Sequence, residues 1–144
     1  MFAVTLICVG KLKEKFYLAA SEEYAKRLRG YVDFTLIELP ETRLPDDPSP
    51  AQIAQGLAKE AELIRARIPK GAWFCVLTPE GTQLSSEELA AALASVKGSG
   101  RSAACFLIGS SFGMDPSLKQ LADRKLSMSK MTFPHHLARV MLLE

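Results

Sequence analysis

The sequence predicts an α/β fold in which a mostly parallel sheet carries helices on both faces. Short apolar runs that end at glycine, proline or a turn alternate with segments of helical apolar periodicity. Strand–helix–strand units of this kind join parallel strands through right-handed crossovers. The 144 residues contain no internal repeat and no linker-like segment, which predicts a single domain spanning 1–144.

The first two strands and helices are recognised by their apolar pattern and by the residues that end them. Val, Ile, Leu and Thr dominate the expected strands, and glycine or proline closes each. Helical spacing marks the first helix, and a serine followed by proline starts the second. In order, these elements are a strand at 2–9, a helix at 14–29, a strand at 32–39 and a helix from Pro50 to about Arg67. Four prolines predict a loop over residues 40–50.

The second half repeats the alternation. A turn sequence, Thr78-Pro-Glu-Gly81, follows the third apolar run, and the spacing of Ser85 and Glu88 is typical of a capping box. Prolines near two further starts are typical of the first helical turn. In order, we expect a strand at 72–77, a helix from Ser85 to Lys97, a strand at 103–108, a helix from Asp115 to about Arg124, a brief extended piece, and a helix at 134–144 whose apolar face carries Leu137, Val140 and Met141.

Composition bounds the function classes. The net charge of +2 does not by itself indicate nucleic-acid binding. A solvated helix face interleaved with glutamates is favoured over a local basic patch made by Lys11, Lys13, Lys15, Lys26, Arg27 and Arg29. Cys8, Cys75 and Cys105 lie inside apolar runs without metal-site spacing, which favours buried thiols in a reducing cytoplasm. The first apolar run is too short for a signal peptide or a membrane span. We therefore expect a cytoplasmic protein without membrane association.

Common catalytic and nucleotide-binding motifs are absent. The chain has no P-loop, no complete GxGxxG, no GxSxG elbow and no HExxH. Thr78–Gly81 with Ser110 and Ser111 is compatible with a flavodoxin-like phosphate loop, and ordinary turns at the sheet edge explain these residues equally well.

The last third of the chain has the pattern of a ligand site. An apolar strand stops at Gly109 in a small-residue loop, and the hydroxyl-rich segment 126–133 follows later without helical periodicity. Two such loops can fold around a small ligand and present backbone groups to it, because glycine and serine permit close approach. Open α/β sheets place binding crevices where strands end in this way. Met128 and Met131 suit either contact with an apolar part of a ligand or core packing.

Three polar residues of the final helix are further candidates. His135 and His136 are adjacent, so their side chains are expected to diverge by about 100°, which disfavours a shared metal ion. One of them is a candidate proton carrier or phosphate contact. Arg139 lies one helical turn further and is either a partner in this site or one half of a salt bridge.

Several segments carry a resemblance to a known family. They are Gly10–Lys15, Glu23–Leu28, Gly81 with Leu84–Glu87, Phe106–Gly109, Leu126–His135 and Arg139–Glu144. Together they resemble the bacterial family that methylates N3 of a pseudouridine in 23S (large-subunit) ribosomal RNA, within the SPOUT class of S-adenosylmethionine-dependent methyltransferases. The resemblance runs from the first strand to the last residue, and Leu126–His135 is its most specific part.

The resemblance implies a SPOUT methyltransferase fold with a C-terminal trefoil knot, a homodimer, and S-adenosyl-L-methionine bound in the knot without a metal. It implies that the ribosome is the partner and that the substrate site is shared between subunits. Carried over by position, the cofactor-binding residues are Leu77, Gly109, Met128, Ser129, Lys130, Met131, Thr132 and Phe133. His135 and Arg139 are the candidate catalytic, substrate-side residues.

The sequence departs from the family pattern at two places. Family members continue beyond the leucine-rich helix into an aromatic–histidine–basic tail, whereas this sequence stops at Glu144, and Ser110-Ser111 stands where many members have glycine. The leading expectation is an RNA methyltransferase. A non-catalytic ribosome-binding or assembly factor that keeps the fold, and a flavodoxin-like flavin module, are the alternatives.

Overall fold

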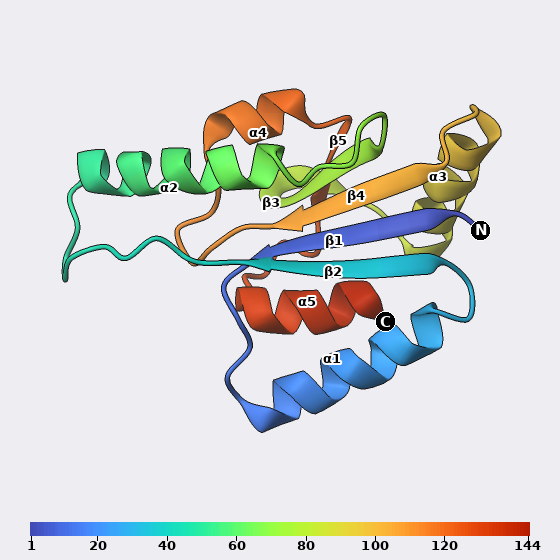
Figure 1. Ribbon diagram of the computed structural model, residues 1–144, viewed down its shortest axis with the longest axis horizontal. Helices are drawn as coiled ribbons and strands as arrows, with labels where there is room; N and C mark the ends of the chain where they lie inside the picture. The colour runs from blue at the N-terminus through green and yellow to red at the C-terminus, as the bar shows by residue number, and fades with distance from the viewer.

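The computed structural model describes residues 1–144 as a five-stranded parallel sheet between two layers of helices (Figure 1). The strands are β1 (Ala3–Val9), β2 (Asp33–Leu39), β3 (Trp73–Gln83), β4 (Ala103–Ile108) and β5 (Arg124–Ser127). The helices are α1 (Lys15–Leu28), α2 (Pro50–Arg65), α3 (Ser86–Gly98), α4 (Pro116–Leu121) and α5 (His135–Leu143). The sheet order is β2-β1-β4-β3-β5, and all neighbours are parallel. The predicted fold class and element order are confirmed.

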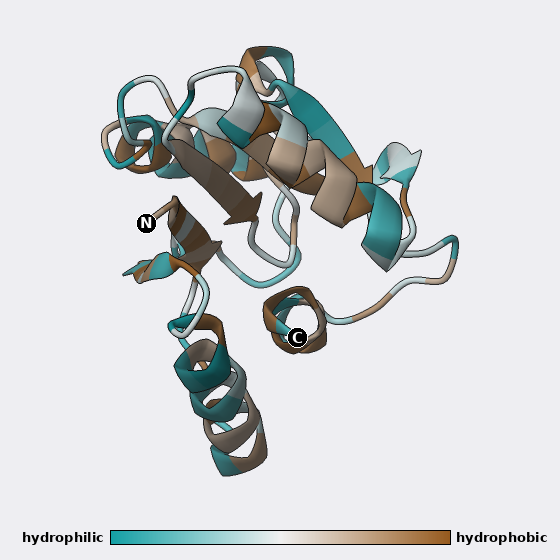
Figure 2. Cartoon of the chain, turned by 90° about the vertical axis from the view of Figure 1, so that its right-hand side faces the viewer, coloured by the Kyte–Doolittle hydropathy of each residue, from teal (hydrophilic) through white to brown (hydrophobic).

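Each face of the sheet has its own apolar core. On one face, side chains of α1, α3 and α5 pack on alternate residues of the strands, such as Leu6 and Phe106. On the other face, α2 and α4 pack on the intervening residues, such as Ile7 and Leu107. Figure 2 shows these apolar strands between the helices, with α1 and α5 beneath them. The central strands β1 and β4 are therefore buried on both faces, as their continuous apolar runs require.

The starts of α2 and α3 follow from local hydrogen bonds. In α3, the Glu88 amide donates to Ser85 Oγ at 3.0 Å and the Ser85 amide donates to Glu88 Oε1 at 2.9 Å, so the predicted capping box is confirmed. Ser49 caps α2 in the same way with Gln52, a reciprocal bond that the sequence reading did not include.

Two element predictions need correction. β3 does not end at Leu77 but continues to Gln83 through a register shift, and Arg124 begins β5 instead of ending α4. Pairing with a strand distant in the sequence decides both outcomes. In α5, the predicted apolar face with Leu137, Val140 and Met141 is half-buried, while Arg139 and Leu143 are buried.

The C-terminal segment crosses from one side of the sheet to its middle. β5 pairs outside β3 at the edge, and the chain then returns beneath the sheet so that α5 packs against α1 (Figure 1). The trefoil knot implied by the family resemblance stays a prediction.

The three cysteines are free and buried, as the sequence predicts. Burial raises the pKa of the Cys8, Cys75 and Cys105 thiols to about 12 in each case, so they remain protonated at neutral pH. None of the helices combines the length and the apolar character that crossing a membrane demands.

Candidate functional site

The carboxyl ends of β3, β4 and β5 surround a pocket of about 970 Å³, which we call the carboxyl-edge pocket. Three chain segments supply most of its lining: residues 77–80, 108–114 and 127–135, with Lys119 and Ala138 beside them. The first segment is part of β3, and the other two follow β4 and β5. This edge of an open parallel sheet is where the loops are free to form a ligand site.

The loop after β4 is a tight turn that requires glycine at two positions, Gly109 and Gly113. Ser110 and Gly113 exchange backbone hydrogen bonds of 3.0 and 2.8 Å, and Gly113 has a φ of +90°. A Cβ atom on Gly109 would collide with the carbonyl oxygen of Gly113. Ser111 Oγ also donates to Glu41 at 3.0 Å, which ties the turn to the loop after β2. The backbone of this loop is therefore held in one conformation at the pocket wall.

The second wall is a bulge within β3. Leu77 and Thr82 both pair with Leu126, so Thr78–Gly81 leaves the ladder and projects into the pocket lining. Gly81 permits this, because a Cβ there would lie 2.7 Å from backbone atoms of Leu126. Thr78 is buried, and its Oγ1 has no hydrogen-bond partner within the chain.

An ion pair fixes the outer part of this wall. Lys119 Nζ on α4 lies 2.5 Å from Glu80 Oε1. Its hydrogen bond holds the pKa of the Glu80 carboxyl at about 2, so the pair is charged at neutral pH. Lys119 and Glu80 connect α4 to the β3 bulge across the pocket lining.

The third wall is the irregular segment after β5. Ser127 Oγ donates to the carbonyl of Ser129 at 3.0 Å, and the Met131 amide donates to Ser129 Oγ at 3.0 Å. These bonds shape an irregular, bent backbone along the pocket that is neither helix nor strand. All eight residues that the family resemblance assigns to cofactor binding lie in one pocket lining: Leu77, Gly109, Met128, Ser129, Lys130, Met131, Thr132 and Phe133. Their role in binding stays a prediction.

The rings of His135 and His136 lie edge to face at the start of α5, with centroids 4.2 Å apart. His135 lines the pocket, whereas His136 contacts Tyr17 and lies 3.9 Å from Glu14 on the α1 side. Burial, with His136 nearby, lowers the pKa of His135 below 6.5. His135 is therefore mostly a neutral imidazole at pH 7, the form that can accept a proton.

Arg139 lies outside the pocket lining and is only 1% exposed. Its Nη1 donates to Glu38 Oε2 at 2.6 Å, and its Nη2 donates to the carbonyl of Gly10 at 3.1 Å. The salt-bridge interpretation of Arg139 fits this geometry, because the guanidinium is enclosed against the ends of β1 and β2. Direct contact of Arg139 with a substrate stays a prediction that this geometry does not favour.

The sequence reading missed some lining residues. Phe112 lies in the β4 loop and is 47% exposed, and Lys119 reaches the pocket from α4. A large aromatic residue between Ser111 and Gly113 was a usable signal, since such a side chain has no buried place in a tight turn. The position of Lys119 depends on how α4 packs, which no local pattern indicates.

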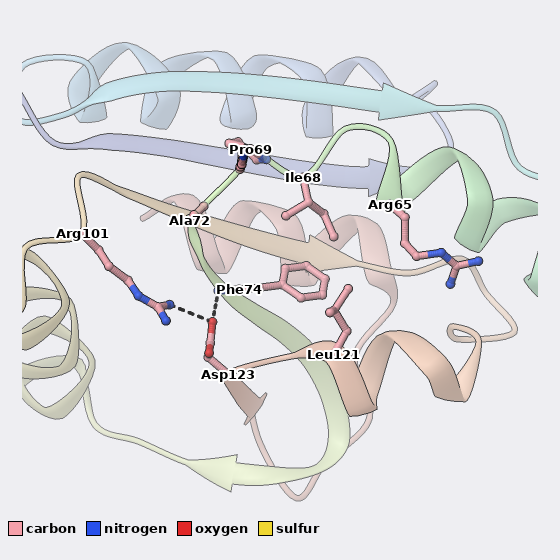
Figure 3. Close-up of a pocket in the computed structure, with 10 residues that line it drawn as sticks. Arg65, Ile68, Pro69, Ala72, Phe74, Arg101, Leu121 and Asp123 are labelled. Atoms are coloured by element: carbon pink, nitrogen blue, oxygen red, sulfur yellow. Dashed lines mark hydrogen bonds and ion pairs between the residues drawn. The ribbon is translucent and has the colours of Figure 1, made fainter.

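A second cavity of about 410 Å³ lies at the opposite, amino edge of the sheet (Figure 3). Ile68, Phe74 and Leu121 form its apolar floor. The Asp123 carboxylate there accepts from the Phe74 amide at 2.8 Å and pairs with Arg101 at 3.0 Å. The carboxylate of this cavity is already paired, and the cavity lies away from the carboxyl ends of the strands. It is therefore a weaker candidate than the carboxyl-edge pocket.

Comparison with known proteins gives consistent matches. A family model described as "Predicted SPOUT methyltransferase" matches residues 2–144. Ribosomal RNA large subunit methyltransferase H of Moorella thermoacetica is 43% identical over 144 residues, which are 100% of this chain and 90% of that protein. The proteins of the same name from Ruminiclostridium cellulolyticum and Bifidobacterium adolescentis are 43% and 44% identical, each over 98% of this chain and 89% of the relative.

Proposed function

The chain belongs to the SPOUT methyltransferase family that includes ribosomal RNA large subunit methyltransferase H, and from this premise we propose that it methylates N3 of a pseudouridine in 23S ribosomal RNA. The methyl donor in this proposal is S-adenosyl-L-methionine. One observation carries it: the segments that resemble the family's cofactor-binding residues are far apart in the sequence and yet line a single pocket. A ribosomal substrate implies that the protein works in the cytoplasm.

The carboxyl-edge pocket has the size and chemistry that this donor needs. Its volume of about 970 Å³ is within the range of small-molecule sites. Leu77, Met128 and Phe133 offer apolar surface for adenine, and the Gly109 turn and the segment after β5 offer backbone groups for hydrogen bonds. Thr78 Oγ1 is buried without a partner in the same lining and is available to a bound polar group.

The reaction needs orientation and the removal of one proton. Bound S-adenosyl-L-methionine supplies an activated methyl group, and transfer forms the N3–CH3 bond as the S–CH3 bond breaks. Pyrimidine N3 must lose its proton to attack. Neutral His135, at the pocket wall, is the side chain best suited to accept that proton. The role of the pocket walls in this proposal is to orient the methyl donor and the base toward each other.

In this proposal the protein acts as a homodimer. The apolar face of α5, with Leu137, Val140 and Met141, is only half-buried within one chain, and Phe16 on the neighbouring α1 is 66% exposed. A second copy packed on this surface would cover it. The dimer would bring the α5 helices, and with them the two His135-containing walls, near one shared boundary.

The decisive experiment combines binding and turnover. Calorimetry measures S-adenosyl-L-methionine binding, and incorporation of labelled methyl into ribosomes from a strain lacking this gene measures transfer. We expect binding with one site per chain or per dimer, and one methyl group per ribosome on a 23S pseudouridine. Binding without transfer would instead indicate a ribosome-binding or assembly factor. A yellow protein that retains flavin would contradict both.

A further inference from the structure

Phe112 is an exposed aromatic residue on a turn that is held by hydrogen bonds. It is 47% exposed and lines the carboxyl-edge pocket. The residues on either side are fixed by the Ser110–Gly113 backbone pair and by the Ser111–Glu41 hydrogen bond. An exposed ring on a rigid turn is oriented before any ligand arrives, which lowers the entropy cost of binding.

A second exposed apolar side chain lines the same pocket from a different loop. Met131 is 72% exposed and follows β5, whereas Phe112 follows β4. Two large, exposed apolar side chains that line one pocket from different loops form a candidate contact surface for a ligand. Thioether sulfur and aromatic rings are both polarizable surfaces that suit a flat nucleobase.

The charges of the pocket lining indicate an anionic partner. Glu80 neutralises Lys119 through their ion pair, and His135 is mostly neutral. Lys130 is exposed and makes no salt bridge, so it contributes an unmatched positive charge next to Met131. A base with its attached phosphate matches an apolar platform beside a single cation.

We propose that Phe112 is a stacking platform for an unstacked base of the substrate RNA, with Met131 as a second apolar contact and Lys130 facing the phosphate. This rests on the proposed function and adds a substrate subsite to it. An enzyme that modifies a base atom must take that base out of its stack, and aromatic stacking offsets part of the lost energy. Phe112 is a positioning residue in this account, because it holds the base while the transfer occurs deeper in the pocket.

The test is a set of substitutions measured on ribosomes from a strain lacking this gene. Phe112→Ala should raise KM for ribosomes about tenfold with little change in kcat, because stacking contributes to substrate binding. Phe112→Tyr should restore the KM, and Phe112→Leu should not, since leucine keeps the apolar bulk without the ring. Tyr31→Ala is the matched control: Tyr31 is 81% exposed, lies after α1 before β2, and should leave KM unchanged.

Two parallel measurements separate the competing explanations. Calorimetry should give an unchanged affinity of Phe112→Ala for S-adenosyl-L-methionine, and sedimentation should give an unchanged oligomeric state. A weakened cofactor affinity would mean that the ring stacks on adenine, and a changed oligomeric state would mean that it packs on a second copy. Either result, or an unchanged KM, overturns the RNA subsite. Absence of methyl transfer by the unaltered protein overturns the proposed function itself. This failure is distinct, because the KM comparison requires a wild-type protein that is active.

Discussion

Arg139 is a buried arginine whose partner lies 101 positions earlier in the chain. Glu38 Oε2 and the carbonyl of Gly10 accept its hydrogen bonds, so one side chain ties α5 to the ends of β1 and β2. A charge that is 1% exposed is tolerated only when it is paired. Arg139 is therefore a structural residue that holds α5 in place, and through α5 it also positions His135.

Substitution of Arg139 should reveal this structural role. Arg139→Ala leaves the Glu38 carboxylate and the Gly10 carbonyl without a partner. We expect a loss of about 3 kcal/mol in the free energy of unfolding, the lower end for breaking a buried pair, since Glu38 is partly exposed. Urea titration measures it. Unchanged stability combined with lost methyl transfer would instead assign Arg139 to the substrate.

His135 makes activity depend on pH in a defined direction. Burial and the neighbouring His136 lower its pKa below 6.5, so the folded protein holds this proton less tightly than the unfolded chain does. Stability therefore falls as pH drops below 6.5, because protons then favour the unfolded state. Activity should be level near pH 7 and fall as pH drops through the lowered pKa, since protonated His135 cannot act as a base.

His135→Gln should remove the acid limb of the pH–rate profile and lower kcat about a hundredfold or more, the usual contribution of a general base. His136→Gln is the matched control. It should keep the acid limb and move it slightly toward higher pH, because a positive neighbour of His135 is lost. Stopped turnover assays from pH 5 to 8 give both profiles. An acid limb that survives in His135→Gln belongs to another group.

For helices and strands, the sequence predicted those bounds that depend on interactions between neighbouring residues. The bounds of β4 follow from its apolar run, and α3 starts at the capping box of Ser85 and Glu88. The bulge of β3 was read as a terminal turn, because its return to the ladder depends on backbone contact between Gly81 and β5. A salt bridge was one of the two roles expected for Arg139, but its partner Glu38 lies in a distant strand, and no local pattern names it.

The candidate site divides in the same way. The β4 loop and the segment after β5 were predicted as ligand loops from small and hydroxyl residues, and the structure brings both to the carboxyl-edge pocket. The parts contributed by packing were not predicted: Lys119 reaches the pocket from α4, and Phe112 is exposed beside the buried Met114. The sequence therefore predicts which loops form the site, whereas the residues that reach the pocket from other elements depend on how those elements pack.

The turn after β4 should be the element most sensitive to a single methyl group. In Gly109→Ala, the new Cβ meets the Gly113 carbonyl, so the turn must open. We expect affinity for S-adenosyl-L-methionine to fall about tenfold or more, measured by calorimetry. Gly98→Ala is the matched control: a Cβ there meets nothing within 4 Å at the end of α3. It should leave affinity unchanged and raise stability by roughly 0.5 kcal/mol. Equal affinities in the two variants would place the cofactor elsewhere.

The whole molecule presents two unlike helical faces. The face covered by α2 and α4 has isolated exposed apolar residues, such as Leu63 at 46%. On the other face, α1 and α5 pack together and leave Phe16 exposed and Val140 and Met141 half-buried (Figure 2 shows the two helices). Exposed and half-buried apolar residues on two packed helices are typical of an interface, whereas a single exposed leucine is ordinary.

Met141→Glu should therefore dissociate the proposed homodimer. A carboxylate buried between two copies has no partner there, and the same unpaired charge occurs twice in a symmetric interface. We expect the dimer to weaken about a hundredfold or more, measured by analytical ultracentrifugation over a range of protein concentrations. Leu63→Glu introduces the same charge on α2 at the other face and should leave the dimer intact.

Because Met141 is half-buried, circular dichroism should accompany the measurement to establish that the monomer remains folded. A folded Met141→Glu variant with wild-type self-association would move the interface away from α5, and a wild-type protein that sediments as a monomer at every concentration would remove the homodimer altogether.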